Sequence, residues 1–379
     1  MPERNDFIPV NEPLLDGNEL VYVTDCIETG WISSEGSYVA AFEAAFAERC
    51  DRAHGIAVTN GSVALELAVE ALDIGVGDEV LLPTFTIVSC LAPLLRRGAT
   101  PVFVDADPAT WTMGVPTLES LVSDRTRAIM PVHIYGLPVD MNPLLEVADR
   151  HGIAVIEDAA EAAGSLYRAR PCGSFGEVSC FSFYANKHVT TGEGGMLLTD
   201  DDALAERLRS LRNLCFLPDR RFVHEELGYN ARMTNLQAAI GLAQVESLDR
   251  HIARKRELGA RYRAGLYDVD GLGSAPVSTD YADNDYWVFG VVLDDSLPVD
   301  AAGFAARLAS RGIGTRPFFF PLHLQPVLRA FDIEPMPGRF PVAERIAARG
   351  LYLPSGLGTT DHQIDRAIDA VRSVIDELR

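Results

Sequence analysis

The sequence contains very little lysine. Among 379 residues only two lysines occur, Lys187 and Lys255, and arginine supplies almost all of the basic charge. Lysine and arginine together number 33 against 54 acidic residues, which gives a net charge of −21. Because such a surface repels polyanions, we expect neither nucleic acid nor an anionic membrane as a partner. The two lysines that remain therefore need an explanation of their own.

Long hydrophobic runs and cysteine motifs are also missing. No apolar stretch reaches the length of a transmembrane span, and the opening residues MPERNDFIPVNEP lack the apolar core of a signal peptide. We therefore expect a cytoplasmic protein. The six cysteines are scattered, with no C-x-x-C pair and no nearby histidine cluster, so the sequence predicts reduced, buried thiols and neither a metal site nor a disulfide framework.

What is present is an alternation of apolar strand patterns and helical patterns. The predicted strands are 79–83, 100–105, 128–136, 154–160, 178–184 and 194–200, and the predicted helices are 62–72, 86–98, 140–152 and 202–213. This order is typical of an α/β fold in which helices cover both faces of a mostly parallel sheet, with ligands at the carboxyl ends of the strands. A helical pattern over 234–266 then leads into a smaller C-terminal α/β domain. We expect an N-terminal arm at 1–16, a large domain at 17–250 and a small domain at 251–379.

Two polar motifs fall at predicted strand ends. In VTNGSVALELAV, Gly61 and Ser62 open a helix, where free amide groups and a hydroxyl can bind phosphate, although Ser62 can equally serve as a helix cap. In VIEDAAEAAG, Asp158 ends an apolar strand, and a buried carboxylate there needs a partner. That partner is a protonated heterocycle nitrogen or an arginine, and the structural alternatives for Asp158 are an ion pair or a helix cap. Glu161, one helical turn onward, can reach the same ligand.

The lysine motif is FSFYANKHVTTGEGG, in which Ser182 lies in a strand and Lys187 follows before a glycine-rich turn. An enzyme that must form a Schiff base needs lysine, because arginine is not a nucleophile at neutral pH. Lys187 has aromatic and small neighbours, whereas Lys255 lies among arginines in HIARKRELGAR and is interpreted as part of a solvated helix face. Asn230, in the polar stretch before the 234–266 helix, is predicted either to bind an anion or to cap that helix.

Together these features predict pyridoxal phosphate, which requires a phosphate cradle, a carboxylate for its ring nitrogen and a lysine for its aldehyde. At this point the chain resembles the DegT/StrS family of nucleotide-sugar aminotransferases, within the fold type I superfamily of aspartate aminotransferase. The resemblance rests on NGSVALELA, PTFTIVS, IEDAAEAAG, FSFYANKHVTTGEGGM and ELGYNARMTNLQAAIG. It implies a three-layer large domain, a smaller C-terminal domain and a homodimer with shared active sites.

The resemblance also assigns roles to residues. Lys187 would form the covalent link to the cofactor, Asp158 would hold the ring nitrogen, and Glu161 would stand where the family often has glutamine or histidine. The phosphate would be held by Gly61, Ser62 and Ser182, with Asn230 contributed by the other subunit. Sugar dehydratases of the family carry histidine in place of this lysine, so Lys187 favours transamination. Many members place an aromatic ring over the cofactor just after P-x-x-T; here Ile87 occupies that place, with Phe85 nearby.

Further stretches, including the N-terminal NEPLLDGNELVYVTDCIETGWISSEG and RPFFFPLHLQP, are similar to the GDP-perosamine synthase branch of the family. This implies L-glutamate as donor, pyridoxamine phosphate as the intermediate cofactor form and GDP-4-keto-6-deoxymannose as acceptor. The candidate substrate-binding residues are Trp31, Ser33, Arg316 and His323; alternatively, Trp31 belongs to the core and Arg316 to a surface ion pair. The alternatives for the protein are an aminotransferase for another GDP-linked or eight-carbon keto sugar (of the mycosamine, lincosamide octose or amino-octulosonate type) and a catalytically silent regulator.

Overall fold

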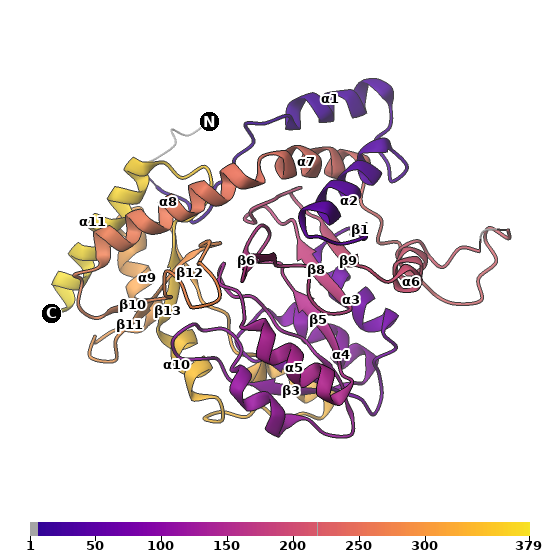
Figure 1. The fold of residues 1–379 in the computed structure, drawn as a ribbon. Coiled ribbons are helices and arrows are strands. Elements are labelled where there is room, and N and C mark those ends of the chain that lie inside the picture. The colour runs from indigo at the N-terminus through magenta and orange to yellow at the C-terminus, as the bar shows by residue number, and fades with distance from the viewer. Residues whose placement is uncertain (1–6, 218) are drawn as a thin grey trace.

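The structure is a computed structural model that describes residues 7–217 and 219–379, so part of the predicted arm, residues 1–6, lies outside the described residues (Figure 1). Within these ranges seven strands form the central sheet, in the order β1-β9-β8-β5-β4-β2-β3. Strand β9 runs antiparallel to both of its neighbours and the other pairs are parallel. The predicted mostly parallel sheet is confirmed, and its two antiparallel pairs both involve β9.

The strands of this sheet are β1 (His54–Val58), β2 (Glu79–Pro83), β3 (Thr100–Val104), β4 (Thr126–Ile129), β5 (Ala154–Asp158), β8 (Val178–Ser182) and β9 (Gly195–Thr199). The strand predicted at 128–136 is much shorter in the structure, where β4 ends at Ile129. It leaves regular pairing at Ile129, and Pro131 shortly afterwards has no amide hydrogen to donate to a neighbouring strand.

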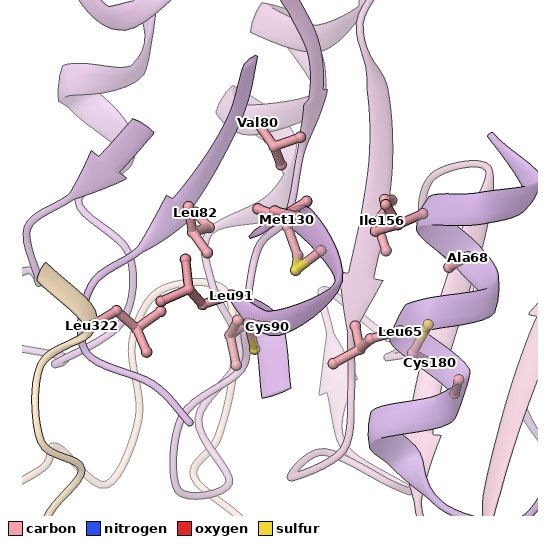
Figure 2. Close-up of a cluster of buried hydrophobic side chains, with 14 of the residues drawn as sticks. Leu65, Ala68, Val80, Leu82, Cys90, Leu91, Met130, Ile156, Cys180 and Leu322 are labelled. Atoms are coloured by element: carbon pink, nitrogen blue, oxygen red, sulfur yellow. The ribbon is translucent and has the colours of Figure 1, made fainter. Parts of the chain in front are cut away.

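Successive side chains of a strand point to opposite faces of the sheet, so these apolar strands present hydrophobic side chains on both faces. Helices cover both faces and bury these side chains. Val80 and Leu82 of β2 enter the cluster in Figure 2, together with Leu65 and Ala68, whereas Leu81 joins a separate cluster on the other face. The first face carries α3 (Gly61–Ala71), α4 (Ala92–Arg97) and α6 (Asp202–Arg212), and the second carries α2 (Ser37–Arg49), α5 (Met141–His151) and α7 (Asn235–Glu246). The large domain therefore has three layers.

A second sheet lies in the C-terminal part of the chain. Its strands are β10 (Leu272–Ser274), β11 (Phe289–Leu293), β13 (Gly350–Leu353) and β12 (Arg316–Pro317), in that order and all antiparallel. The helices of this part are α8 (Leu248–Leu266), α9 (Ala301–Ala309), α10 (Pro341–Arg349) and α11 (Asp361–Leu378). We keep the domain division as a proposal, in which the boundary at 250 falls in the first turn of α8, the long helix that leaves the large domain in Figure 1.

The remaining elements connect these parts. They are α1 (Glu19–Thr29), which lies against α7, the hairpin of β6 (Leu166–Tyr167) and β7 (Arg170–Pro171), and the short 3-10 turns η1 (Val88–Cys90), η2 (Val115–Leu121), η3 (Leu322–Leu324) and η4 (Pro326–Phe331). All six cysteines are free and buried, as predicted. Among the described residues, no helix combines the length and apolarity that crossing a membrane demands.

The described part of the arm contacts the C-terminal part of the chain. Ile8 pairs with the backbone around Ile313, and the carbonyl groups of Val10 and Glu12 accept hydrogen bonds from Ser355 and Gly358. The segment 8–12 therefore behaves as an additional strand-like edge that holds the loops after β13 in place.

Candidate active site

A cavity of about 720 Å³ opens at the carboxyl ends of the central strands. Its walls come from the start of α3, the ends of β5 and β8, the loop that follows β8, and three aromatic side chains of the C-terminal part. Seven of the residues singled out in the sequence line it: Gly61, Ser62, Asp158, Glu161, Ser182, Lys187 and Arg316. Residues that are far apart in the sequence are therefore gathered at one edge of the sheet, as the parallel arrangement predicts.

The start of α3 forms one end of the cavity. The cap of this helix is Asn60, whose side chain accepts a hydrogen bond from the amide of Val63 at 2.9 Å, so Ser62 is not the cap. The hydroxyl of Ser62 instead lies 2.7 Å from that of Ser89. At Gly61, a Cβ atom would lie 2.7 Å from the Cβ of Ser182, so only glycine lets the helix start this close to β8. A pair of serine hydroxyls and a helix N-terminus at one end of a cavity suit a phosphate group.

Asp158 lies at the floor of the cavity. It is 2% exposed, and its carboxylate accepts hydrogen bonds from the amide of Ala160 at 3.1 Å and the thiol of Cys90 at 3.1 Å. Burial raises the pKa of Asp158. No cationic side chain of the described residues forms an ion pair with it, which excludes the structural ion pair that the sequence left open. A buried carboxylate of this kind, with one side open to the cavity, suits a protonated ring nitrogen.

Lys187 faces Asp158 from the loop after β8. Its Nζ atom lies 3.8 Å from Oε1 of Glu161 and 3.7 Å from the centre of the Trp287 ring. Burial lowers the pKa of Lys187, while the charge of Glu161 opposes this effect. Oε2 of Glu161 accepts a hydrogen bond from the amide of Tyr135 at 2.8 Å, and burial raises the pKa of Glu161 to about 7. The lysine amine thus lies between the face of Trp287 and the carboxylate of Glu161, and its pKa is lowered.

Arg316 also reaches the cavity. It lies on the short strand β12 and is exposed, and no ion pair to another described residue involves it. The surface ion pair considered for Arg316 is therefore absent from the described structure. A cation without a counterion at the mouth of a cavity in a strongly acidic protein suits an anionic ligand.

The structure contradicts the prediction that His323 binds substrate. Its side chain has no exposed surface, and its two ring nitrogens lie 2.6 Å from the hydroxyl of Thr84 and 3.1 Å from Glu344. Because its two nitrogens are taken up by Thr84, which directly follows β2, and by Glu344 of α10, the ring connects η3 to these two segments and does not line the cavity. The aromatic stretch around His323 does not indicate that its ring is buried between distant segments.

Three further predicted residues do not line this chain's cavity. Trp31 is 57% exposed, so it is not a core residue, and Ser33 accepts a hydrogen bond through its carbonyl from the amide of Asn235 at 2.7 Å. Asn230 is exposed and accepts a hydrogen bond from Arg232 at 2.9 Å. It does not cap α7: Thr234 does so, in a reciprocal pair with Gln237. The roles of Trp31, Ser33 and Asn230 stay predictions.

The interpretation of Lys255 as part of a solvated face is wrong. This side chain is 1% exposed, and its Nζ donates hydrogen bonds to the carbonyl groups of Trp287, at 2.9 Å, and of Ser355. The arginines around it in the sequence point to other sides of α8, because neighbours in a helix are separated by about 100° of rotation.

Sequence reasoning missed the aromatic wall of the cavity. Trp287, Phe319, Tyr352 and Tyr184 line it, and so do Arg96 and Glu66, which form an ion pair at its rim. Trp287 lies in the apolar run YWVFGVVL, which is typical of a strand, but β11 begins only at Phe289. The preceding Asn-Asp pair was a turn signal that could have separated this tryptophan from the strand. Of the two candidates for the cofactor face, Ile87 lines the cavity and is half-exposed, whereas Phe85 is buried against Tyr135.

The chain is similar to known sugar aminotransferases. Residues 13–372 match the sequence profile of the DegT/DnrJ/EryC1/StrS aminotransferase family. A GDP-perosamine synthase of Caulobacter vibrioides is 43% identical over 368 residues, which cover 97% of this chain and 98% of that protein. The solved aminotransferase TlmJ of Streptoalloteichus hindustanus superposes with a TM-score of 0.90 at 34% identity and covers 98% of this chain and 99% of its own. DesV of S. venezuelae, solved with a ketimine intermediate, gives a TM-score of 0.87 at 36% identity, covering 95% of this chain and 94% of its own.

Proposed function

The chain belongs to the DegT/DnrJ/EryC1/StrS aminotransferase family, and we propose that it moves an amino group from L-glutamate to the keto carbon of GDP-4-keto-6-deoxymannose. It is a pyridoxal phosphate-dependent aminotransferase of fold type I. The observation that carries the proposal is the amine of Lys187, which lies in the cavity beside Glu161 and opposite the unpaired Asp158. The choice of sugar nucleotide rests on the GDP-perosamine synthases, which are 38% to 43% identical to this chain.

The residues of the cavity fit the cofactor. Its phosphate would be held by the first amides of α3 with the hydroxyls of Ser62 and Ser182, and Asp158 would keep its ring nitrogen protonated. When bound, pyridoxal phosphate supplies the electron sink that lets a proton leave the carbon next to the amino group. A neutral side chain at 158 would weaken that sink, because the ring nitrogen would lose its counterion.

Lys187 would carry the proton between substrate and cofactor carbons, because its amine is enclosed and its pKa is lowered. A general base is most effective when its pKa lies near the working pH, and burial moves lysine in that direction. Glu161 would limit this shift by attracting the ammonium form. The walls of Trp287 and Tyr352 would exclude water from the reacting atoms during both half-reactions.

The substrate would enter past Arg316 and the rim of Arg96 and Glu66. A sugar nucleotide carries two phosphates, and an arginine without a counterion can bind them through charge-assisted hydrogen bonds. GDP-linked substrate, L-glutamate and product would therefore use the same opening in turn. This is the expected consequence of a single cavity that serves both half-reactions.

We further propose a homodimer with shared active sites. Its support is the apolar surface of α1 and the following turn, where Leu20, Val21, Ile27, Trp31 and Ile32 are each at least 50% exposed. An exposed apolar surface of this kind marks an interaction site. Residues 219–230, which include the exposed Phe222 and end at Asn230, project from the body in Figure 1. In a dimer, Asn230, Trp31 and Ser33 would reach the partner's cavity.

Single-turnover mass spectrometry tests the acceptor. The protein in its pyridoxamine phosphate form is mixed with GDP-4-keto-6-deoxymannose, its dTDP-linked 4-keto-6-deoxyglucose counterpart, a GDP-keto-octose or an eight-carbon keto acid, and amino products are sought. We expect the first compound to react. Reaction of another GDP-linked or eight-carbon substrate alone would keep the chemistry and replace the sugar. A catalytically silent regulator would fail earlier, since it would form no 2-oxoglutarate from L-glutamate.

A further inference from the structure

The second lysine of the chain is buried next to the first. Lys255 lies on α8, and its ammonium group donates hydrogen bonds to two neutral carbonyl groups, those of Trp287 and Ser355. Among the described residues no carboxylate forms an ion pair with Lys255. Burying a charge without a counterion is costly, so such a residue persists only where its contacts serve a purpose. One carbonyl belongs to Trp287, which lines the cavity, and the other to Ser355 in the loop after β13.

Trp287 holds the lysine loop at two points. The face of its ring lies 3.7 Å from Nζ of Lys187, and its indole nitrogen donates a hydrogen bond to the carbonyl of Asn186 at 2.8 Å. An ammonium group over an indole face is attracted to it, more strongly when water is excluded. The same side chain therefore fixes both the backbone before Lys187 and the amine at its end.

The backbone of Trp287 is itself held in an unusual conformation. The residue before it, Tyr286, has a φ of 51°, in the left-handed region that few non-glycine residues adopt. A Cβ atom at Gly136 would lie 2.5 Å from the amide nitrogen of Trp287, so the two segments touch directly. The amide of Tyr286 also donates a hydrogen bond to the side-chain oxygen of Asn284 at 2.8 Å. A strained turn persists only when surrounding contacts hold it, and the bond from Lys255 is one of them.

We infer that Lys255 is a positioning residue for Lys187 and acts through Trp287. The connection runs from the Lys255 ammonium to the carbonyl of Trp287, and from the ring of Trp287 to the amine of Lys187. Lys255 thereby links α8, the loop after β13 and the lysine loop, three segments that the sequence keeps far apart. The inference rests on the proposed role of Lys187 as the reacting amine.

Charge gives Lys255 a second possible route to Lys187, which the experiment must separate from the first. The groups that face Lys187 are Glu161, Asp158 and Cys90, and those that face Lys255 are His188 and Lys187 itself. Burial lowers the pKa of Lys255 to about 7, and the charge of Lys187 acts in the same direction. Removing Lys255 therefore removes both a hydrogen-bond donor and a nearby positive charge.

The small number of lysines makes a direct measurement possible. The full-length protein is prepared with lysine isotopically labelled at Cε and loaded with pyridoxamine phosphate, which leaves the amine of Lys187 free. Nuclear magnetic resonance then reports two lysine side chains. The Cε signal of Lys187 should be shifted by the ring current of Trp287, and Trp287→Leu should abolish that shift and lower the pKa of Lys187 by about one unit.

Lys255→Met should remove most of the ring-current shift, since Trp287 loses the donor that fixes its carbonyl. When Trp287→Leu is already present, only the loss of the Lys255 charge remains, so Lys255→Met should then raise the pKa of Lys187. With Trp287 in place, the loss of the ring contact opposes this rise, so the pKa changes in the two backgrounds should differ. Arg254→Met is the matched control: Arg254 lies on the same helix and bonds to the carbonyl of Thr359 at 2.8 Å, so its loss should leave the Lys187 signal unchanged.

An unchanged ring-current shift in Lys255→Met, or equal pKa changes in the two backgrounds, would overturn the inference. If Lys255→Met does not fold, Lys255→Gln retains N–H donors without the charge and should show a partial loss of the shift. A full shift in that variant would count against positioning by the ammonium group. The readout requires no turnover, so failure of the proposed reaction would be seen separately, as missing 2-oxoglutarate.

Discussion

The carboxylate of Glu161 lies 3.8 Å from the amine of Lys187, and both groups are buried. Each group therefore affects the protonation of the other: the carboxylate favours the ammonium form, and the ammonium favours the carboxylate. Burial acts against both charges and raises the pKa of Glu161 to about 7. The Glu161 carboxylate therefore opposes the loss of the Lys187 proton that burial favours.

Glu161→Gln should shift the pH profile of the glutamate half-reaction to lower pH by roughly one unit. The reaction needs the neutral amine, and loss of the nearby carboxylate destabilises the ammonium form, so the pKa of Lys187 falls further. The measurement is the rate of pyridoxamine phosphate formation from pH 5 to 10 in rapid-mixing absorbance experiments. An unchanged or upward-shifted profile would show that Glu161 does not act as the counterion.

Lys187→Ala should reduce turnover more than a thousandfold, because covalent attachment and proton transfer are both lost. The measurement is 2-oxoglutarate formation, together with borohydride reduction of the wild-type protein and mass spectrometry of its peptides. The reduced cofactor should be found on the peptide with Lys187 alone. The chain's other lysine, Lys255, is the internal control, and cofactor on its peptide would refute the assignment.

Asp158→Asn should slow the half-reaction at least a hundredfold while preserving the fold. Asparagine has the same shape but leaves a buried ring nitrogen without its counterion, and losing one partner of a buried charged pair costs about 3 kcal/mol. The test compares half-reaction rates and melting temperatures of the two proteins. A folded variant that reacts at the wild-type rate would mean that the ring nitrogen lies elsewhere.

Gly61→Ala should weaken cofactor binding by roughly tenfold or more, about 1.4 kcal/mol. The added Cβ would lie 2.7 Å from the Cβ of Ser182, so α3 must move away from β8 and its amides from the phosphate. Gly273→Ala is the matched control, since the nearest atom to its Cβ would lie 3.7 Å away. Fluorescence titration with pyridoxal phosphate measures both, and equal affinities would exclude a cradle at Gly61.

Lys255→Met should flatten the pH dependence of stability above neutral pH. The pKa of Lys255 falls from 10.5 to about 7 on folding, so between these values the unfolded chain binds more protons than the folded one. Stability of the wild type should then rise with pH in this interval, by up to about 1.4 kcal/mol per pH unit from this residue. Urea unfolding at pH 7 and pH 9.5 measures the difference, and an identical dependence in both proteins would contradict the lowered pKa.

The features that the sequence predicted well are those set by local pattern. Continuous apolar runs predicted the parallel sheet, and the carboxyl ends of its strands then placed Gly61, Asp158 and Lys187 at one edge. Lysine scarcity also singled out Lys187. These inferences succeeded because period, turn residues and residue chemistry act over a few neighbours along the chain.

The errors concern residues whose surroundings come from distant segments. Lys255 looks solvated among arginines, but its partners are the carbonyls of Trp287 and Ser355, which lie 32 and 100 residues away. His323 was predicted to bind substrate, yet its two ring nitrogens form hydrogen bonds with Thr84 and Glu344. No local pattern encodes which carbonyl or hydroxyl will meet a buried polar group.

The strand-like segment at 8–12 has a consequence for synthesis of the chain on the ribosome. Its backbone partners lie at 312–358, and the side chain of Asn11 bonds to the carbonyl of Ala185 in the lysine loop at 3.2 Å. The segment at 8–12 is synthesised early, but its backbone hydrogen bonds can form only after residues more than 300 positions later have been added. Contacts between such distant residues form slowly. The large domain can collapse while translation continues, but the support of its lysine loop is completed only near the end. Chaperone dependence of this protein should accordingly be concentrated in the interval before β13 emerges.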